Sequence, residues 1–416
     1  MTFDQAEVTQ FYERHSYPYR PAGHGGDASL IGIPSDIRFI NHFIFNGRRD
    51  FSKPFRVLVA GGGTGDAVIG LGRQLVELGC PADLVYIDLS TQSRDIAEGR
   101  AQDLGLNGVR FLTGRIQDLP RLAPGPYDYI DFCGVINHVG DQEYVLDVLS
   151  GLLALGGGIG VMAYGQLGRT GVYHVQDMLR MVGAGQEDVG LARALLSALP
   201  QTNWHQRNAI FQETSTEPDV EIADRYLNPS DRAFTVAELR GLAGGAGLKI
   251  AAFAPPLFYD PLPFIADSDL RGRVAKLSWI DRCIFAETYN GDIPMHNFYM
   301  VADDTVIRPD ALLEAKNTIP IMVSIPAGQG PTVANGVFGF TMQCGPLARQ
   351  LTLPGTDQSG AIVRAIDGQK SLQQIHRSLP GSLSWRAFQR EFAAVYRGLN
   401  GAGELVLSTT PMPRLR

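Results

Sequence analysis

Three glycines at alternate positions, Gly61, Gly63 and Gly65, follow the short apolar run Val57–Ala60 in the segment VLVAGGGTGDA. Glycine adopts backbone conformations that other residues avoid, and it lets a ligand approach the chain where a Cβ atom would collide. The spacing is GxGxG, which is tighter than the GxGxxG fingerprint of dinucleotide binding. The loop therefore predicts a cofactor site that does not match the dinucleotide pattern.

The elements that must position this loop alternate between strands and helices. Apolar runs typical of strands occupy residues 57–60, 83–90, 108–114, 127–135 and 156–164. Stretches that favour helices lie between them, at 69–78, 90–105 and 141–156. Such alternation forms a parallel sheet through right-handed crossovers, with helices on both faces. Residues 55–165 are therefore predicted to form an α/β domain of the nucleotide-binding type.

Five segments of this region occur in a fixed order. They are AGGGTGD, YIDLS, which ends its strand in Asp88, FLTGRIQDLP, YDYIDFCGVINHV and LLALGGGIGVMAYG. Together they resemble the five motifs of the class I S-adenosylmethionine-dependent methyltransferases. The resemblance implies an α/β fold with a Rossmann-like seven-stranded sheet and helical insertions, and it implies S-adenosyl-L-methionine as the cofactor. An unrelated doubly wound fold with similar loops is the alternative.

The resemblance assigns cofactor contacts residue by residue. The glycines lie under the methionine part with Asp66 near its ammonium group, and the two carboxylate oxygens of Asp88 accept the ribose hydroxyls. Ile116 offers a backbone amide to adenine. Arg115 stands where many relatives carry aspartate, and Asp118 is the substitute that the sequence offers. The full predicted set is Ala60, Gly61, Gly62, Gly63, Gly65, Asp66, Asp88, Leu89, Arg115, Ile116, Cys133, Gly134 and Val135.

Three residues at the ends of the fourth and fifth strands are the catalytic candidates: Asn137, His138 and Tyr164. They fall at the edge of the sheet where doubly wound folds bind substrate. The resemblance allows His138 to act as a base or as a structural imidazole bonded to backbone. Methyl transfer from a sulfonium needs mainly alignment, desolvation and, for a protonated acceptor, a base. The sequence therefore indicates the cofactor better than the catalyst.

The flanking segments supply candidate acceptor residues. The segment FYERHSYPYR carries Tyr12, Tyr17 and Tyr19 and resembles the FYxxxPYP stretch ahead of the methyltransferase core in a bacterial subgroup. These phenols either close over the cofactor and substrate as a lid or pack on the core. Arg169 either pairs with an acidic acceptor group or forms a surface salt bridge. Tyr226 either belongs to the acceptor pocket or to a turn, because its segment ADRYLNPSDRAF, which also carries Asp224, is rich in turn residues.

Composition excludes several other classes of protein. The 416 residues carry a net charge of -7 without a cluster of Lys and Arg, so we expect no nucleic-acid partner. The 4 cysteines lack CxxC spacing, which argues against a zinc site or a disulfide framework. No signal peptide and no long apolar run is visible, so we expect a cytoplasmic protein without membrane partners.

We expect three parts: an N-terminal helical lid at 1–50, a methyltransferase domain at 51–305 and a C-terminal domain at 306–416. The middle part carries a helical substrate insertion at about 166–233 and a second one at about 255–295. The segment AETYNGDIPMHNFYM resembles a stretch in bacterial protein-lysine methyltransferase-like proteins. The tail reads as two or three short helices followed by a β pair, a small α+β unit like a winged helix. It has too few basic residues for DNA, which favours protein contact or a homodimer.

These observations lead to three hypotheses about function. The first is a methyltransferase whose acceptor is a nitrogen or oxygen of a protein or peptide side chain. The second keeps the enzyme class but replaces the acceptor with a small molecule. The third is a regulatory subunit that binds the cofactor without transferring its methyl group. No metal is expected in any of them.

Overall fold

The computed structural model describes residues 5–20, 31–212, 214–323, 332–334, 337–344, 347–354, 358–379, 381 and 383–412. Residues 1–4 and 21–30 of the predicted N-terminal lid lie outside these ranges. The described part of the lid begins with α1 (Gln5–Arg14).

A seven-stranded sheet forms the centre of the molecule, with strand order β3-β2-β1-β4-β5-β7-β6. The strands are β1 (Phe55–Ala60), β2 (Ala82–Asp88), β3 (Arg110–Thr113), β4 (Tyr127–Cys133), β5 (Leu153–Tyr164), β6 (Leu248–Phe253) and β7 (Met295–Ala302). The first five are parallel, and β7 runs antiparallel to both of its neighbours. This arrangement confirms the predicted Rossmann-like seven-stranded sheet.

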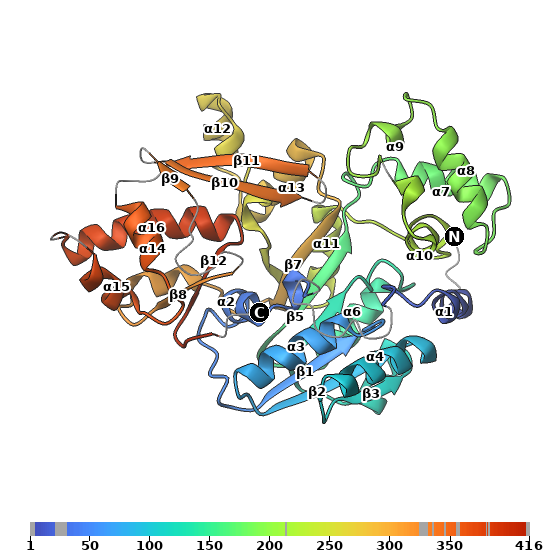
Figure 1. Ribbon diagram of the computed structural model, residues 1–416, viewed down its shortest axis with the longest axis horizontal. Helices are drawn as coiled ribbons and strands as arrows, with labels where there is room; N and C mark the ends of the chain where they lie inside the picture. The colour runs from blue at the N-terminus through green and yellow to red at the C-terminus, as the bar shows by residue number, and fades with distance from the viewer. Residues whose placement is uncertain are drawn as a thin grey trace.

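Successive side chains of each strand point to opposite faces of the sheet, and helices cover both faces. Leu58 of β1 packs in a core with residues of α6 (Gln142–Gly151) and α11 (Val236–Gly245). Val57 and Val59 pack in a second core with residues of α2 (Ile37–Phe43) and α3 (Asp66–Glu77). The helix α4 (Thr91–Asp103) adds Ala97 to this second core. Figure 1 shows α3 and α4 together beside β1 and β2.

Helix starts follow their capping residues. Asp36 accepts a hydrogen bond from the Arg38 amide at the start of α2. A capping box between Thr235 and Glu238 begins α11. Local sequence chemistry therefore places these helix ends, and the packed cores place the helices.

Two insertions interrupt the sheet between β5 and β7. The first contains α7 (Val172–Met181), α8 (Val189–Ala198), α9 (Trp204–Arg207), α10 (Asp219–Ile222) and the π-helix η5 (Ala223–Leu227), around a core of its own. The second contains the 3₁₀ turns η6 (Pro256–Tyr259) and η7 (Leu262–Phe264), then α12 (Ser268–Val274) and α13 (Trp279–Asn290). Figure 1 places the first insertion, in green, next to α1. Across the described ranges, every helix is too short or too polar to cross a bilayer.

The C-terminal part differs from the expected order of elements. It contains η8 (Pro309–Glu314), β8 (Ile319–Met322), β9 (Thr332–Ala334), β10 (Val337–Cys344), β11 (Leu347–Pro354), α14 (Ser359–Ala365), α15 (Leu372–Ser378), α16 (Trp385–Gly401) and β12 (Leu405–Ser408). The predicted helices are present, but the predicted β pair after them is wrong. The strand β12 follows the helices and pairs with β8, which precedes them. The arrangement therefore does not show a winged helix.

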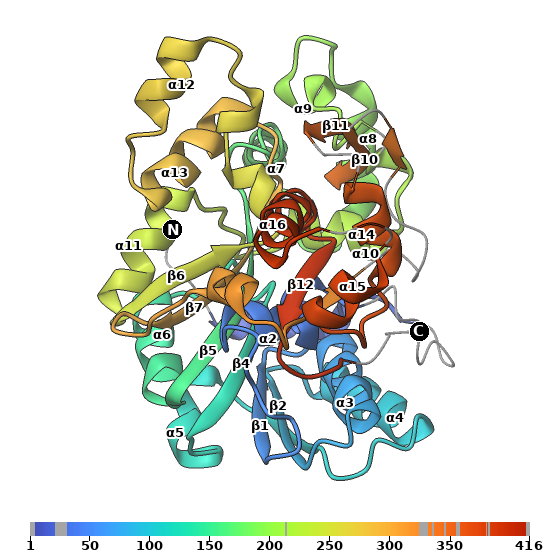
Figure 2. The same ribbon diagram turned by 90° about the vertical axis from the view of Figure 1, so that its left-hand side faces the viewer.

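A buried histidine joins this C-terminal part to the core. His42 lies on α2, and its Nδ1 is 3.1 Å from the Leu407 backbone nitrogen while its Nε2 is 3.0 Å from the Tyr396 hydroxyl oxygen. Figure 2 shows α2 below α16 and β12. Burial lowers the pKa of His42 from 6.5 to about 4. The imidazole therefore stays neutral in the folded protein across the mildly acidic range.

We expect the free energy of unfolding to fall as the pH is lowered from 6.5 to about 4, because the unfolded chain binds a proton that folded His42 refuses. The loss attributable to this residue is at most about 3 kcal/mol. Urea titrations at several pH values measure it. His42→Asn should flatten the dependence, whereas His174→Asn, at an exposed position of α7, should keep it. Equal slopes in the two variants would contradict the assignment.

Candidate active site

A cavity of about 860 Å³ lies at the carboxyl ends of β1, β2, β4 and β5. Its walls come from the sheet, from the N-terminal segments at residues 8–20 and 31–35 and from the first insertion around residues 210–225. Pockets for drug-sized ligands span about 300–1,000 Å³. The volume therefore suits a nucleoside cofactor with space beside it for a second group.

The glycine loop forms the floor of this cavity. Gly61, Gly63 and Gly65 have φ values of +74°, +52° and +102°, a region that other residues rarely adopt. A Cβ atom on Gly61 would lie 2.5 Å from a methyl carbon of Val135, and one on Gly63 would lie 2.5 Å from the Tyr17 carbonyl oxygen. The glycines thus let neighbouring parts of the protein close around the loop, a reason that the sequence did not reveal.

Asp88 ends β2 with its carboxylate at the cavity wall. Its Oδ2 accepts a hydrogen bond of 2.8 Å from the Gly63 amide, and its Oδ1 accepts one of 2.9 Å from the Ser90 amide. Burial raises the pKa of Asp88, and the amides of Ser90 and Gly63 oppose that rise. Each carboxylate oxygen has a second lone pair, so the group can still accept a pair of hydroxyls. This pair of acceptor oxygens fits the hydroxyls of a ribose.

The adenine side differs from the expectation. Ile116 lines the cavity, but Arg115 and Asp118 do not, because they form an ion pair with each other at 2.9 Å near the surface. The residue between them, Gln117, lines the cavity instead. Its amide can donate to and accept from a base edge. Nothing in the sequence marked Gln117 apart from its position beside Ile116.

The N-terminal segment crosses the glycine loop and is tied to it. The Thr64 amide donates a hydrogen bond of 3.2 Å to the Tyr17 carbonyl oxygen. Asp66 forms ion pairs with Arg20 at 2.5 Å and with Arg100 at 2.9 Å. Asp66, expected near the methionine ammonium group, therefore anchors Arg20, which sequence reasoning missed.

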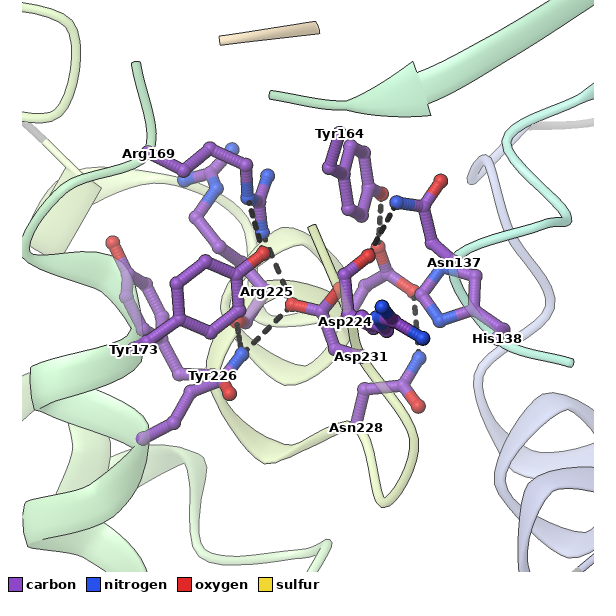
Figure 3. A network of polar contacts seen from close by, with 12 residues as sticks. Asn137, His138, Tyr164, Arg169, Tyr173, Asp224, Arg225, Tyr226, Asn228 and Asp231 are labelled. Carbon is purple, nitrogen blue, oxygen red and sulfur yellow. Dashed lines mark hydrogen bonds and ion pairs between the residues drawn. The ribbon is translucent and has the colours of Figure 1, made fainter. Parts of the chain in front are cut away.

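The other end of the cavity holds a buried carboxylate among phenols (Figure 3). The Tyr12 hydroxyl donates to Asp224 Oδ1 at 3.2 Å, and the Tyr164 hydroxyl donates to Oδ2 at 3.5 Å. Asn228 donates to the same Oδ1 at 3.3 Å. Burial, followed by the negative charge of Asp224, raises the pKa of both Tyr12 and Tyr164. These phenols therefore stay neutral at physiological pH.

A second acid extends this end of the cavity. Tyr17 donates a hydrogen bond of 3.3 Å to Glu221 Oε2, and both residues line the cavity. Burial raises the pKa of Tyr17 and also that of Glu221. Tyr12 and Tyr17 thus bring phenols from the N-terminal segment onto two acids of the first insertion. We call Tyr12, Tyr17, Tyr164, Glu221 and Asp224 the acid–tyrosine cluster.

His138 also lines the cavity, with its ring edge-on to Tyr12 and Tyr164. Its Nδ1 lies 2.6 Å from the Ser230 carbonyl oxygen. A carbonyl only accepts, so Nδ1 carries the hydrogen and Nε2 of the neutral ring has a free lone pair. Asn137 does not line the cavity, because its side-chain amide donates to the Arg232 carbonyl at 2.6 Å.

Most predicted site residues line the cavity, and six of them do not. Those that line it are Gly61, Gly62, Gly63, Asp66, Asp88, Leu89, Ile116, Cys133, Gly134, Val135, His138, Tyr164, Tyr12, Tyr17 and Arg169. Those outside it are Ala60, Gly65, Arg115, Asn137, Tyr19 and Tyr226.

Tyr226 and Tyr19 are corrections to the predicted acceptor set. The Tyr226 hydroxyl lies 2.7 Å from Nε2 of His205 inside the core of the first insertion, and Tyr19 is exposed to solvent. Glu221 of α10 and Arg225 of η5, which no sequence pattern singled out, line the cavity from positions before and after Asp224 in the sequence. Arg225 lies in the turn-rich segment ADRYLNPSDRAF and Glu221 lies just before it, so charge was the signal that the two shared.

Residues 58–159 match the family model described as a methyltransferase domain. An uncharacterised protein from Synechococcus is 27% identical over 253 residues, which cover 59% of this chain and 60% of that protein. The match thus spans less than two thirds of the relative's length.

Two solved structures share the fold at low identity. The structure of PKMT2 from Rickettsia typhi aligns with a TM-score of 0.66 and 17% identity over 94% of this chain and 77% of that chain. Its complex with AdoHcy aligns equally well, over 95% and 78%. At this identity the likeness shows a common fold, and it extends well beyond the matched domain.

The matched segment includes the glycine loop, Asp88 and Ile116, which together form the cofactor end of the cavity. The hydrogen-bonding groups of these residues and the volume of the cavity fit S-adenosyl-L-methionine. The chain therefore contains a methyltransferase domain with a Rossmann-like sheet, and its cofactor end fits S-adenosyl-L-methionine.

Proposed function

We propose that this protein transfers the methyl group of S-adenosyl-L-methionine to an amine of a protein or peptide side chain, of the lysine type. The acid–tyrosine cluster carries this proposal. A buried carboxylate attracts an ammonium group through charge-assisted hydrogen bonds, and aromatic rings around it add cation–π attraction. The shared fold with PKMT2, a protein-lysine methyltransferase by name, supports the same acceptor class.

The chain's own residues divide the work between the two ends of the cavity. The glycine loop, Asp88 and Ile116 would hold the cofactor, which when bound supplies an electrophilic methyl group on a sulfonium. The acid–tyrosine cluster would orient the acceptor nitrogen toward that group. Because methyl donation needs no further activation, alignment and exclusion of water supply most of the rate.

A proton must leave the acceptor before its nitrogen can attack. A lysine ammonium group has no lone pair, and two groups that can accept a proton line this end of the cavity, the Asp224 carboxylate and the His138 ring. The neutral phenols of Tyr12 and Tyr164 keep their own protons and serve as hydrogen-bonding partners. We therefore assign Asp224 the binding of the ammonium group, with the proton passing to Asp224 or His138.

We also propose separate roles for the three predicted parts of the chain. Within the described residues, the cavity lining ends at Asn297, so the part at 306–416 does not contribute to it. We infer that the N-terminal segment and the first insertion select the acceptor. The C-terminal part is left for contacts with a protein partner or a second copy of the chain in the cytoplasm.

Transfer of label from methyl-tritiated cofactor into a cell lysate tests the function. We expect label in protein bands, and mass spectrometry of those bands should place the added methyl on lysine nitrogen. Label confined to the low-mass fraction would favour a small-molecule acceptor. Absence of any labelled product, with cofactor binding intact, would favour a regulatory subunit.

A further inference from the structure

Two arginines line the acceptor end of the cavity beside the acid–tyrosine cluster. Arg169 follows β5 and is only 5% exposed, and its guanidinium carbon lies 3.9 Å from the ring centre of Tyr164. Arg225 comes from η5, and its side chain is 17% exposed. Figure 3 shows both guanidinium groups on the same side of the network as Tyr173. The cavity thus carries positive charge next to its negative end.

Contacts in the wall hold both side chains in place. Arg169 is 3.2 Å from Asp231 through Nη2 and 3.3 Å from the Tyr173 hydroxyl through Nε. Arg225 forms an ion pair with Glu217. These contacts neutralise each arginine locally, and they also fix its position before any ligand arrives.

The two arginines bring like charges together at one end of the cavity. The two guanidinium groups interact electrostatically, and like charges that share a partly buried cavity repel each other. Asp231, the partner of Arg169, has a fully buried side chain that does not line the cavity. A planar guanidinium group that faces a cavity matches a carboxylate, because its N–H fork can bind both oxygens.

We propose that Arg169 and Arg225 form a carboxylate subsite next to the amine site, and that the enzyme selects acceptors with a carboxylate near the amine. The inference rests on the proposed function. Two sources offer this chemistry: an Asp or Glu side chain that flanks the acceptor lysine in a peptide, and the α-carboxylate of a free amino acid. Arg169 lies over the face of the Tyr164 ring and Asp224 accepts a hydrogen bond from its hydroxyl, so one tyrosine separates the groups that would bind the two charges of such an acceptor.

The test compares matched acceptors with the full-length protein and tritiated cofactor. One pair is a peptide with lysine between two glutamates and the same peptide with glutamines. The other pair is free lysine and lysinamide, which lacks the carboxylate. We expect the wild type to prefer the carboxylate member of one pair by about tenfold in kcat/KM, as for a charge-assisted contact. The preferred pair identifies the source.

Arg225→Gln should abolish this preference by slowing the carboxylate member alone, and Arg225→Lys should keep part of it. Arg207→Gln removes the same charge from an exposed position of the same insertion and should keep the full preference. Calorimetry with S-adenosylhomocysteine should give the same Kd for the wild type and Arg225→Gln.

Three results would overturn the subsite. If the wild type methylates peptide or lysine without a preference for the carboxylate member, the subsite is excluded and the proposed function stands. A preference that persists in Arg225→Gln assigns the selection elsewhere, and a weakened Kd for S-adenosylhomocysteine assigns Arg225 to the cofactor. Failure of the wild type to methylate any of the four acceptors contradicts the proposed function, and the subsite falls with it.

Discussion

Asp88→Ala is expected to weaken binding of S-adenosylhomocysteine at least about 100-fold. The two carboxylate oxygens are placed to accept two hydroxyls, and a hydrogen bond to a charged group contributes about 1.5–3 kcal/mol. The substitution also frees the amides of Gly63 and Ser90, which Asp88 holds at 2.8 Å and 2.9 Å. Isothermal titration calorimetry measures the loss. The glycine loop should become less ordered as well, which hydrogen exchange can detect.

A matched control lies on the same strand. Asp83 is exposed and pairs with Arg56, away from the cavity, so Asp83→Ala should bind as tightly as the wild type. Asp88→Asn keeps one side-chain oxygen and should fall between the two. If Asp88→Ala bound the ligand within about threefold of the wild type, the cofactor assignment would be wrong.

Asp224→Asn is expected to reduce methyl transfer to lysine peptides by at least about 100-fold while cofactor binding stays unchanged. The substitution preserves the shape of the group and part of the hydrogen bonding with Tyr12 and Tyr164. It removes the charge that attracts the ammonium group and one acceptor for its proton, and loss of such a charged contact costs several kcal/mol at a buried site. Steady-state kinetics with tritiated cofactor and calorimetry in parallel separate the two effects.

The control for this variant is Asp219→Asn, on α10 of the same insertion. The Asp219 side chain is 78% exposed and pairs with Arg193, so its charge should not affect transfer. Equal loss in both variants would point to a change in the insertion as a whole. Full activity of Asp224→Asn would remove Asp224 from the acceptor site.

The N-terminal segment links the two halves of this chemistry. The Tyr12 carbonyl oxygen accepts a hydrogen bond of 3.4 Å from the Ser90 hydroxyl, next to Asp88, while the Tyr12 hydroxyl reaches Asp224. Tyr17 behaves in the same way, with its carbonyl on Thr64 and its hydroxyl on Glu221. The predicted lid thus contacts the cofactor loop through its backbone and the acceptor pocket through its phenols.

Local patterns were enough to predict the sheet and the cofactor end. The apolar runs form β1 to β5 in the structure. Asp36 caps α2, and Thr235 caps α11. Caps, strand periodicity and glycine stereochemistry act over a few residues, so a single sequence displays them. The glycine loop and Asp88 lie next to each other because they stand at the carboxyl ends of two neighbouring strands of one parallel sheet.

The C-terminal part shows where local patterns are insufficient. The tail was predicted to end in a β pair after its helices, but the strand that follows the helices, β12, pairs with a strand that precedes them. The strand β8 lies before the helices, and β12 also packs on α2 from the beginning of the chain. Pairing between distant strands depends on the whole packed structure, which periodicity does not encode.

The acceptor end was decided by tertiary structure. The sequence left open whether Tyr226 belongs to the acceptor pocket or to a turn, and the π-helix η5 turns Tyr226 into the core of the insertion and brings Asp224 and Arg225 to the cavity. Tyr12 meets Asp224 across 212 residues of sequence. The sequence by itself determined a Rossmann-like sheet and a cofactor loop, because those depend on neighbours along the chain. The acceptor pocket was decided only when three distant segments packed together, because burial and charge pairing there depend on neighbours in space.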